Sequence, residues 1–122
     1  MKLMVIGFGG FFGAILRYLS SKYVNIFFSF SFPLGTLLVN VTGSLLLGYF
    51  HTLFIEKLAI SENIRMFISV GFLGAFTTFS TFSLETLNLL EDGLYMIFIF
   101  NILLNVILSI LFAYLGIALA RV

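Results

Sequence analysis

Four stretches of this chain are each long enough and apolar enough to cross a lipid bilayer. A crossing helix needs about 20 apolar residues to span roughly 30 Å of hydrocarbon. Lipid offers no hydrogen-bond partner to the backbone, so a segment of this length must satisfy its own N–H and C=O groups by becoming helical. We therefore predict one all-α transmembrane domain over residues 1–122, with spans at about 3–19, 33–55, 66–90 and 94–120.

Composition supports this prediction and excludes several classes of function. Hydrophobic residues make up 61% of the chain and charged residues only 9%, against about 25% charged in a soluble domain. A net charge of +1 does not favour nucleic acid as a partner. The chain has no cysteine and one histidine, His51, which excludes thiol nucleophiles and a multi-histidine metal site within one subunit. We expect a multi-pass membrane protein and not an enzyme, with His51 at the interface and without an assigned role.

The distribution of basic residues bears on orientation. Four spans place both termini on one side, and positive residues favour the cytoplasmic side. The terminal side carries Lys2, Lys57, Arg65 and Arg121, and the other side carries Arg17 and Lys22. This modest bias favours cytoplasmic termini and leaves insertion in both orientations open. Arg17 interrupts the first span, which does not have the pattern of a cleavable signal, and Ser20–Phe32 is predicted to be an interfacial connection.

Four hydroxyls stand close together in the third span, within the sequence Thr77–Phe82. A hydroxyl in hydrocarbon needs a partner that lipid cannot supply. One interpretation is that each bonds back to the carbonyl four residues earlier, which bends a helix. The other is a break in the helix, which is tolerated at membrane depth where the backbone is buried in protein or lines an aqueous cavity. We predict a break, and with it a pore or a binding site.

Polar residues recur at helical spacing on three of the spans, and each set falls on one helix face. The three sets are Thr36, Asn40 and Gly43 on the second span, Thr78, Thr81 and Glu85 on the third, and Asn101, Asn105 and Ser109 on the fourth. Any one set can be a means of holding helices together by hydrogen bonds. Three sets together supply many donors and only one carboxylate, and this favours an anion path over a cation path.

Two further features allow a structural and a functional interpretation. Phe79 and Phe82 share a helix face and can simply pack, but the electropositive edge of each ring can also lie against an anion. Arg17 can extend to the interface or provide a positive potential near a pore mouth.

Gly9 and Gly13 form a GxxxG pair, which predicts a close helix contact within or between subunits. Because four short helices make a thin wall, we expect a homo-oligomer, most simply a dimer.

Three segments resemble the signatures of the CrcB family of fluoride channels, also called Fluc: Gly9–Tyr18, Gly35–Ser44 and Gly71–Glu85. The resemblance covers the whole chain, and the third segment is the most specific. The fourth span is similar only in general character. Asn101 and Asn105 occupy a region where some members carry a tyrosine, and their roles stay open.

The resemblance implies a passive channel that exports toxic fluoride, built as an antiparallel, dual-topology homodimer in the plasma membrane with two pores. It implies ring edges facing fluoride from Phe79 and Phe82, a donor amide at Asn40 and a hydroxyl track at Ser80 and Thr81. The remaining pore positions that it implies are Thr36, Ser109, Glu85 and Arg17. It also implies a structural sodium ion at the dimer centre, bound by the backbone carbonyls of Gly74 and Thr77 from each subunit.

Two other classes of function are considered. A proton-coupled small multidrug exporter also has four short helices, but it needs a carboxylate in its first helix, and Gly7–Leu19 contains none. A membrane assembly protein without transport activity would account for the GxxxG pair and would leave the three polar sets without a role.

Overall fold

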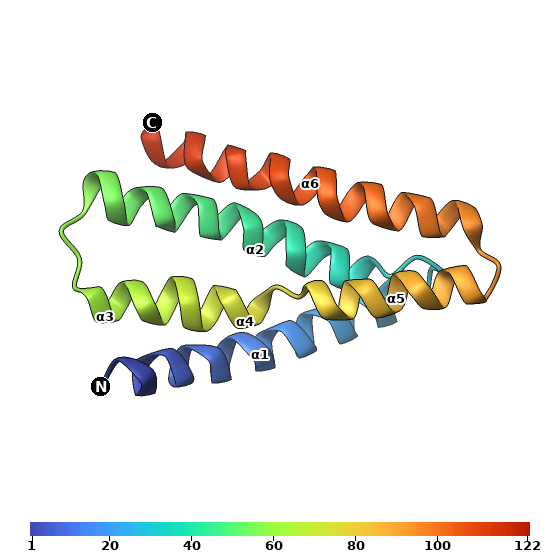
Figure 1. Ribbon diagram of the computed structural model, residues 1–122, viewed down its shortest axis with the longest axis horizontal. Coiled ribbons are helices and arrows are strands. Elements are labelled where there is room, and N and C mark those ends of the chain that lie inside the picture. Colours follow the sequence, from blue (N-terminus) through green and yellow to red (C-terminus); the bar gives the residue numbers. More distant parts are fainter.

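The computed structural model describes all of residues 1–122, and every regular element in it is a helix. Figure 1 shows the elements in chain order. They are α1 (Lys2–Phe27), α2 (Leu34–Thr52), η1 (Leu53–Lys57), α3 (Glu62–Arg65), η2 (Met66–Leu73), α4 (Gly74–Phe76), α5 (Phe79–Glu91) and α6 (Tyr95–Arg121). The η segments are wound as π-helix and continue their neighbours, so the chain forms four candidate membrane spans: Lys2–Phe27, Leu34–Lys57, Glu62–Glu91 and Tyr95–Arg121. The prediction of four spanning helices is confirmed.

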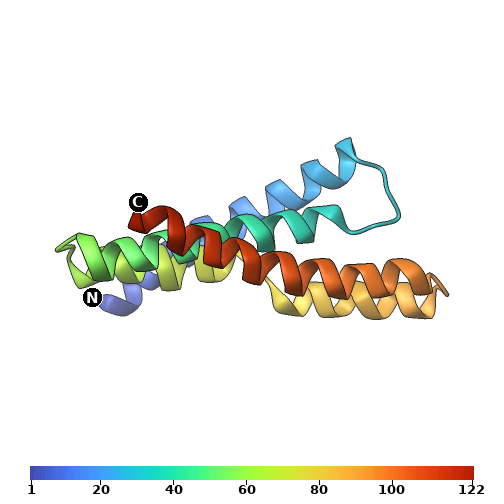
Figure 2. The ribbon, with the colours of Figure 1, turned by 90° about the horizontal axis from the view of Figure 1, so that it is seen from above.

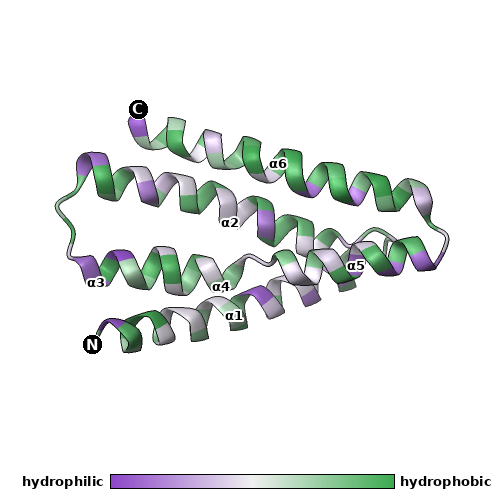
Figure 3. Cartoon of the chain, viewed as in Figure 1, coloured by the Kyte–Doolittle hydropathy of each residue, from purple (hydrophilic) through white to green (hydrophobic).

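The two termini lie at the same end of the molecule as α3 (Figure 1). Ion pairs tie that end together, with Lys2 Nζ 2.8 Å from a carboxylate oxygen of Glu62 and Arg121 Nη2 2.7 Å from one of Glu56. Towards the other end the molecule forks, because the end of α1 and the start of α2 diverge from the α5–α6 hairpin (Figure 2). Apolar residues cover most of each helix, and hydrophilic residues lie both at the helix ends and at isolated positions within the spans (Figure 3).

Glycines set the two closest helix contacts. On α1, a Cβ atom at Gly9 or Gly13 would meet backbone atoms of η2, at Gly13 the carbonyl group of Phe72. Gly48 of α2 and Gly116 of α6 stand in the same relation across the α2–α6 contact. Without a hydrophobic driving force between helices in lipid, close backbone approach is what gives them packing energy. The GxxxG pair is therefore used within one chain, in the contact of α1 with η2.

The first helix is longer than predicted, and this corrects the interpretation of Ser20–Phe32 as an interfacial connection. The segment is helical as far as Phe27, because no glycine or proline interrupts it before Pro33. The extension has a structural use, since the Oδ1 atom of Asn25 accepts a hydrogen bond of 2.9 Å from the N–H of Gly35 at the start of α2. The predicted polar turn after the third span is present, and Gly93 adopts the left-handed φ of 74° that ends α5.

Candidate functional site

The third span is broken at two residues. α4 ends at Phe76 and α5 begins at Phe79, and between them Thr77 and Thr78 are extended, with ψ of 158° and 120°. Thr78 also caps the second half, since its Oγ1 atom accepts a 3.2 Å hydrogen bond from the N–H of Thr81. The predicted helix break is confirmed, and it falls at the first two hydroxyl residues of the run.

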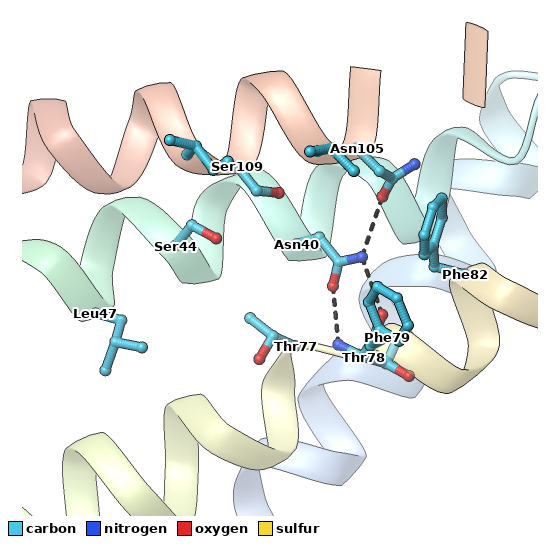
Figure 4. A pocket seen from close by; sticks show the side chains of 11 residues that line it. Asn40, Ser44, Leu47, Thr77, Thr78, Phe79, Phe82, Asn105 and Ser109 are labelled. Carbon is cyan, nitrogen blue, oxygen red and sulfur yellow. Dashed lines mark hydrogen bonds between the residues drawn. The ribbon is translucent and has the colours of Figure 1, made fainter. Parts of the chain in front are cut away.

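The side chain of Asn40 on α2 supplies the hydrogen bonds that the break removes. Its Oδ1 atom accepts from the N–H of Thr78 at 2.8 Å, and its Nδ2 atom donates to the Thr78 carbonyl at 3.0 Å. The same Nδ2 atom donates to Oδ1 of Asn105 on α6 at 3.1 Å (Figure 4). An unpaired peptide group in this interior would cost about 1–3 kcal/mol. The Asn40 amide therefore stabilises the extended conformation at the break and links α2, α6 and the third span.

Asn101 and Asn105, whose roles the sequence left open, form the next links of this network. Asn101 is completely buried, and its Nδ2 atom donates to Oγ1 of Thr86 on α5 at 2.8 Å. The Nδ2 atom of Asn105 donates in turn to Oδ1 of Asn101 at 2.9 Å. The bonds thus run from α5 through α6 to Asn40 and the break. Thr86 was not among the predicted site residues, because its neighbours Ser83, Glu85 and Asn88 are also polar and the sequence did not single it out.

A cavity of about 290 Å³ opens on one side of the break. Figure 4 shows its lining, in which polar groups from α2, α6 and the break lie beside two rings. The polar residues are Asn40, Ser44, Thr77, Thr78, Asn105 and Ser109. The rings of Phe79 and Phe82 stand edge to face, with centroids 5.4 Å apart and planes at 61°. Phe82 is buried, with 6% of its surface exposed, whereas Phe79 is 76% exposed.

A second cavity, of about 270 Å³, lies on the other side of the break and is far more polar. Its lining residues are Arg17, Tyr18, Ser21, Lys22, Thr36, Thr78, Thr81 and Glu85. Thr36 Oγ1 donates to Oε1 of Glu85 at 2.8 Å, and the other carboxylate oxygen of Glu85 is buried without a partner. Because Thr78 lines both cavities, they adjoin at the break.

The structure thus brings most of the predicted site residues to two cavities that share Thr78. Of the predicted pore positions, Ser109 lines the first cavity and Thr36 the second. Arg17 and Glu85 both line the second cavity, to which Tyr18, Ser21 and Lys22 also contribute. These three residues were not predicted from the sequence. Ser21 had a signal there, because it follows Arg17 by four residues and so lies on the same helix face. Ser80 and Gly74 line neither cavity and are exposed on the surface of the chain.

These features define a class: a small multi-pass membrane protein with a broken helix and two cavities with polar linings beside the break. The sequence profile of the family described as "CrcB-like protein, Camphor Resistance (CrcB)" matches residues 4–117. The chain therefore belongs to the CrcB family.

Similar proteins match nearly the whole chain. A protein of Campylobacter jejuni is 53% identical over 114 residues, 93% of each chain. One of Sulfurihydrogenibium sp. is 49% identical over 120 residues, 98% of this chain and 97% of the relative. One of Magnetococcus marinus is 44% identical over 121 residues, 99% and 98% of the two chains. Each relative is named fluoride-specific ion channel FluC.

Proposed function

We propose that this protein is a passive, fluoride-selective channel of the plasma membrane. The observation that carries the proposal is the pair of cavities that meet at Thr78, lined by hydroxyls, two amides and two aromatic rings. Relatives up to 53% identical bear the name of a fluoride channel. Neither a multidrug exporter nor an assembly protein is favoured, because the first span has no carboxylate and the polar residues converge on one path.

The chemistry of the lining suits a small, strongly hydrated anion. A pore must replace the water around fluoride with close donors. The hydroxyls of Ser44 and Ser109, which make no hydrogen bond within the chain, are such donors at the first cavity. The edges of the Phe79 and Phe82 rings carry partial positive charge and have no hydrogen-bonding group that would hold the ion too tightly. A larger anion, such as chloride, would not fit a narrow path between these groups.

The exposed residues at the break support assembly with a second copy. Phe79, Ser80 and Thr81 are exposed on the isolated chain, in the middle of a span. Lipid offers no partner to the two hydroxyls, so a protein surface is the more stable cover. We propose an antiparallel homodimer in which a second copy covers this face and completes two pores. Dual topology agrees with the modest difference in basic residues between the two ends of the chain.

Two backbone carbonyls fit the proposed central sodium site. In a continuous helix the N–H of Thr78 would donate to the Gly74 carbonyl. Here it donates to Asn40, so the Gly74 carbonyl does not receive that bond. The Thr77 carbonyl accepts no hydrogen bond from a peptide N–H. Two copies would bring four such oxygens together, and oxygen is the ligand that a hard cation prefers. A bound sodium ion would hold the two breaks together across the dimer.

Fluoride efflux from liposomes, recorded with a fluoride electrode, tests the proposed function. The expected result is rapid fluoride efflux with no measurable chloride efflux. No efflux, or equal efflux of both ions, would refute the channel. Phe79→Ile and Phe82→Ile should each slow efflux strongly, whereas Phe100→Ile, a change at an exposed position of α6, should not.

Cysteine crosslinking tests the proposed dimer, and the absence of native cysteine makes single additions unambiguous. A cysteine near the terminal end of one copy should crosslink to one near the opposite end of the other. Crosslinks only between equivalent ends would refute the antiparallel arrangement. Replacement of sodium by a large organic cation should weaken the dimer. If dimer stability did not depend on sodium, the proposed cation site at Gly74 and Thr77 would be refuted.

A further inference from the structure

A separate polar cavity lies at the terminal end of the molecule. It has a volume of about 140 Å³ and opens between the end of α2 and the start of the third span. His51 of α2 contributes from one side, and Arg65 of α3 and Ser69 of η2 contribute from the other. Phe54, Met66 and Val70 complete its walls. No carboxylate lines this cavity, so its polar groups are a guanidinium, an imidazole and a hydroxyl.

The charges around the cavity leave the guanidinium of Arg65 without a counter-ion. The two carboxylates of this end are both taken, since Glu62 pairs with Lys2 and Glu56 with Arg121. Arg65 makes no ion pair and no side-chain hydrogen bond to another residue of the chain, and it is half-buried. Its five N–H donors therefore face the cavity and its surroundings unsatisfied. A positive, donor-lined hollow of this size is suited to a small anion.

The position of His51 connects this cavity to the proposed pore. On α2, His51 follows Asn40 by eleven residues, which is close to three full helical turns and about 16 Å along the axis. Ser44 and Leu47 lie between them on the same helix face, and both line the cavity beside the break. One face of α2 thus runs from the break to the terminal end, and His51 stands where that face reaches Arg65.

We propose that His51, Arg65 and Ser69 form an anion-binding pocket that serves as the mouth of the fluoride path at the terminal end. The inference rests on the proposed function for the identity of the ion, while the pocket itself follows from charge and geometry. The Arg17 cavity lies on the other side of the break, so the path has a basic residue near each end. The pocket raises the local concentration of fluoride before the ion loses its water at the break.

Nuclear magnetic resonance tests binding without any flux measurement. His51 is the only histidine, so protein labelled with ¹⁵N-histidine and carrying no histidine tag has one imidazole to observe. Sodium fluoride should shift the imidazole signals in a saturable way, and sodium gluconate at equal ionic strength should not. In Arg65→Gln the shift should require at least several-fold more fluoride. An unshifted signal in the wild type, or an identical titration of Arg65→Gln, would overturn the proposal.

Flux at two ionic strengths tests the role of the pocket as a mouth. Arg65→Gln should lower fluoride flux about threefold at low salt, the effect of one charge a few ångströms from an ion in a water-like medium. The difference should shrink at about 1 M salt, where screening acts over roughly 3 Å. Lys57→Gln removes an exposed, unpaired cation of the same end that does not line the cavity, and it should leave flux unchanged.

The outcomes separate this inference from the proposed function. In one outcome the wild type conducts fluoride, and Arg65→Gln and Lys57→Gln either lose flux equally or lose none. That outcome refutes the pocket and leaves the proposed channel function intact. A wild type that does not conduct but whose His51 signal titrates with fluoride refutes the channel and supports the pocket. Each variant is first compared with the wild type by size-exclusion elution, and Arg65→Lys, which keeps the charge, should restore the flux at low salt.

Discussion

Replacement of Asn40 by alanine is the most informative single change, because it removes three hydrogen bonds at the helix break together. The two to Thr78 hold the extended backbone, and the third, to Asn105, holds α6. Thr78 is buried, so its N–H and C=O groups lose their partners inside the protein. The change tests whether the break depends on one side chain.

The expected loss of stability can be worked out in two ways, from the average free energy of an interhelical hydrogen bond or from the cost of leaving a buried polar group without a partner. Interhelical hydrogen bonds in membrane proteins average about 0.6 kcal/mol, which gives roughly 2 kcal/mol for three bonds. Orphaned buried groups cost about 1–3 kcal/mol each, which gives a larger loss. The cavity of about 290 Å³ beside Asn40 decides between them, because water that enters it can satisfy the orphaned groups. We therefore expect the lower value, about 2 kcal/mol.

Two measurements check this reasoning. The free energy of unfolding, from titration with a denaturing detergent, should fall by about 2 kcal/mol in Asn40→Ala. Fluoride efflux should fall about tenfold or more, the effect of raising the barrier by about 1.4 kcal/mol, because the break that lines both cavities loses its support. Asn88→Ala, at an exposed asparagine of α5, is the control and should change neither quantity. Equal stability of the two variants would refute the assigned role of Asn40.

Three further changes test other parts of the structure. Gly13→Ala should lower the melting temperature, because its Cβ atom would meet the η2 backbone. Gly7→Ala is the control and should not lower it, because a Cβ atom there would meet nothing within 4 Å. Equal melting temperatures would contradict the close α1–η2 contact. Thr86→Val should cost about 1 kcal/mol of unfolding free energy by leaving the buried Asn101 amide without its acceptor, and no change would show that the bond is weak. Gly93→Ala should cost about 1 kcal/mol because φ there is 74°, and unaltered stability would contradict the left-handed turn.

Local patterns were sufficient for most of the fold. Apolar length predicted four spans, and the glycine of the polar turn at residues 91–93 has the positive φ that ends the third span. The end of the first helix was predicted too early, because Ser20–Phe27 is mixed in polar and apolar character and its contact with α2, through Asn25 and Gly35, is not visible in the segment itself. The π-helical winding of η1 and η2 had no sequence signal.

The candidate site was predictable in its residue types and only partly in its connections. Helical spacing placed Asn40 and Thr36 on one face, but it did not show that Asn40 bonds Thr78 while Thr36 bonds Glu85. Spacing within one helix also gave no information about which cavity each residue lines, and the structure places Thr36 and Ser109 in different cavities.

The sequence by itself determined that this protein is a bundle of membrane-spanning helices with an interrupted third span. That follows from properties of single segments, because apolar length forces helix formation in lipid and clustered hydroxyls cannot face hydrocarbon. Only the tertiary structure decided which polar residues meet, and hence that Asn40 stabilises the break and that His51 lies beside Arg65. Those pairings depend on how helices approach one another, and glycine contacts between distant segments, such as Gly13 against η2, set that approach.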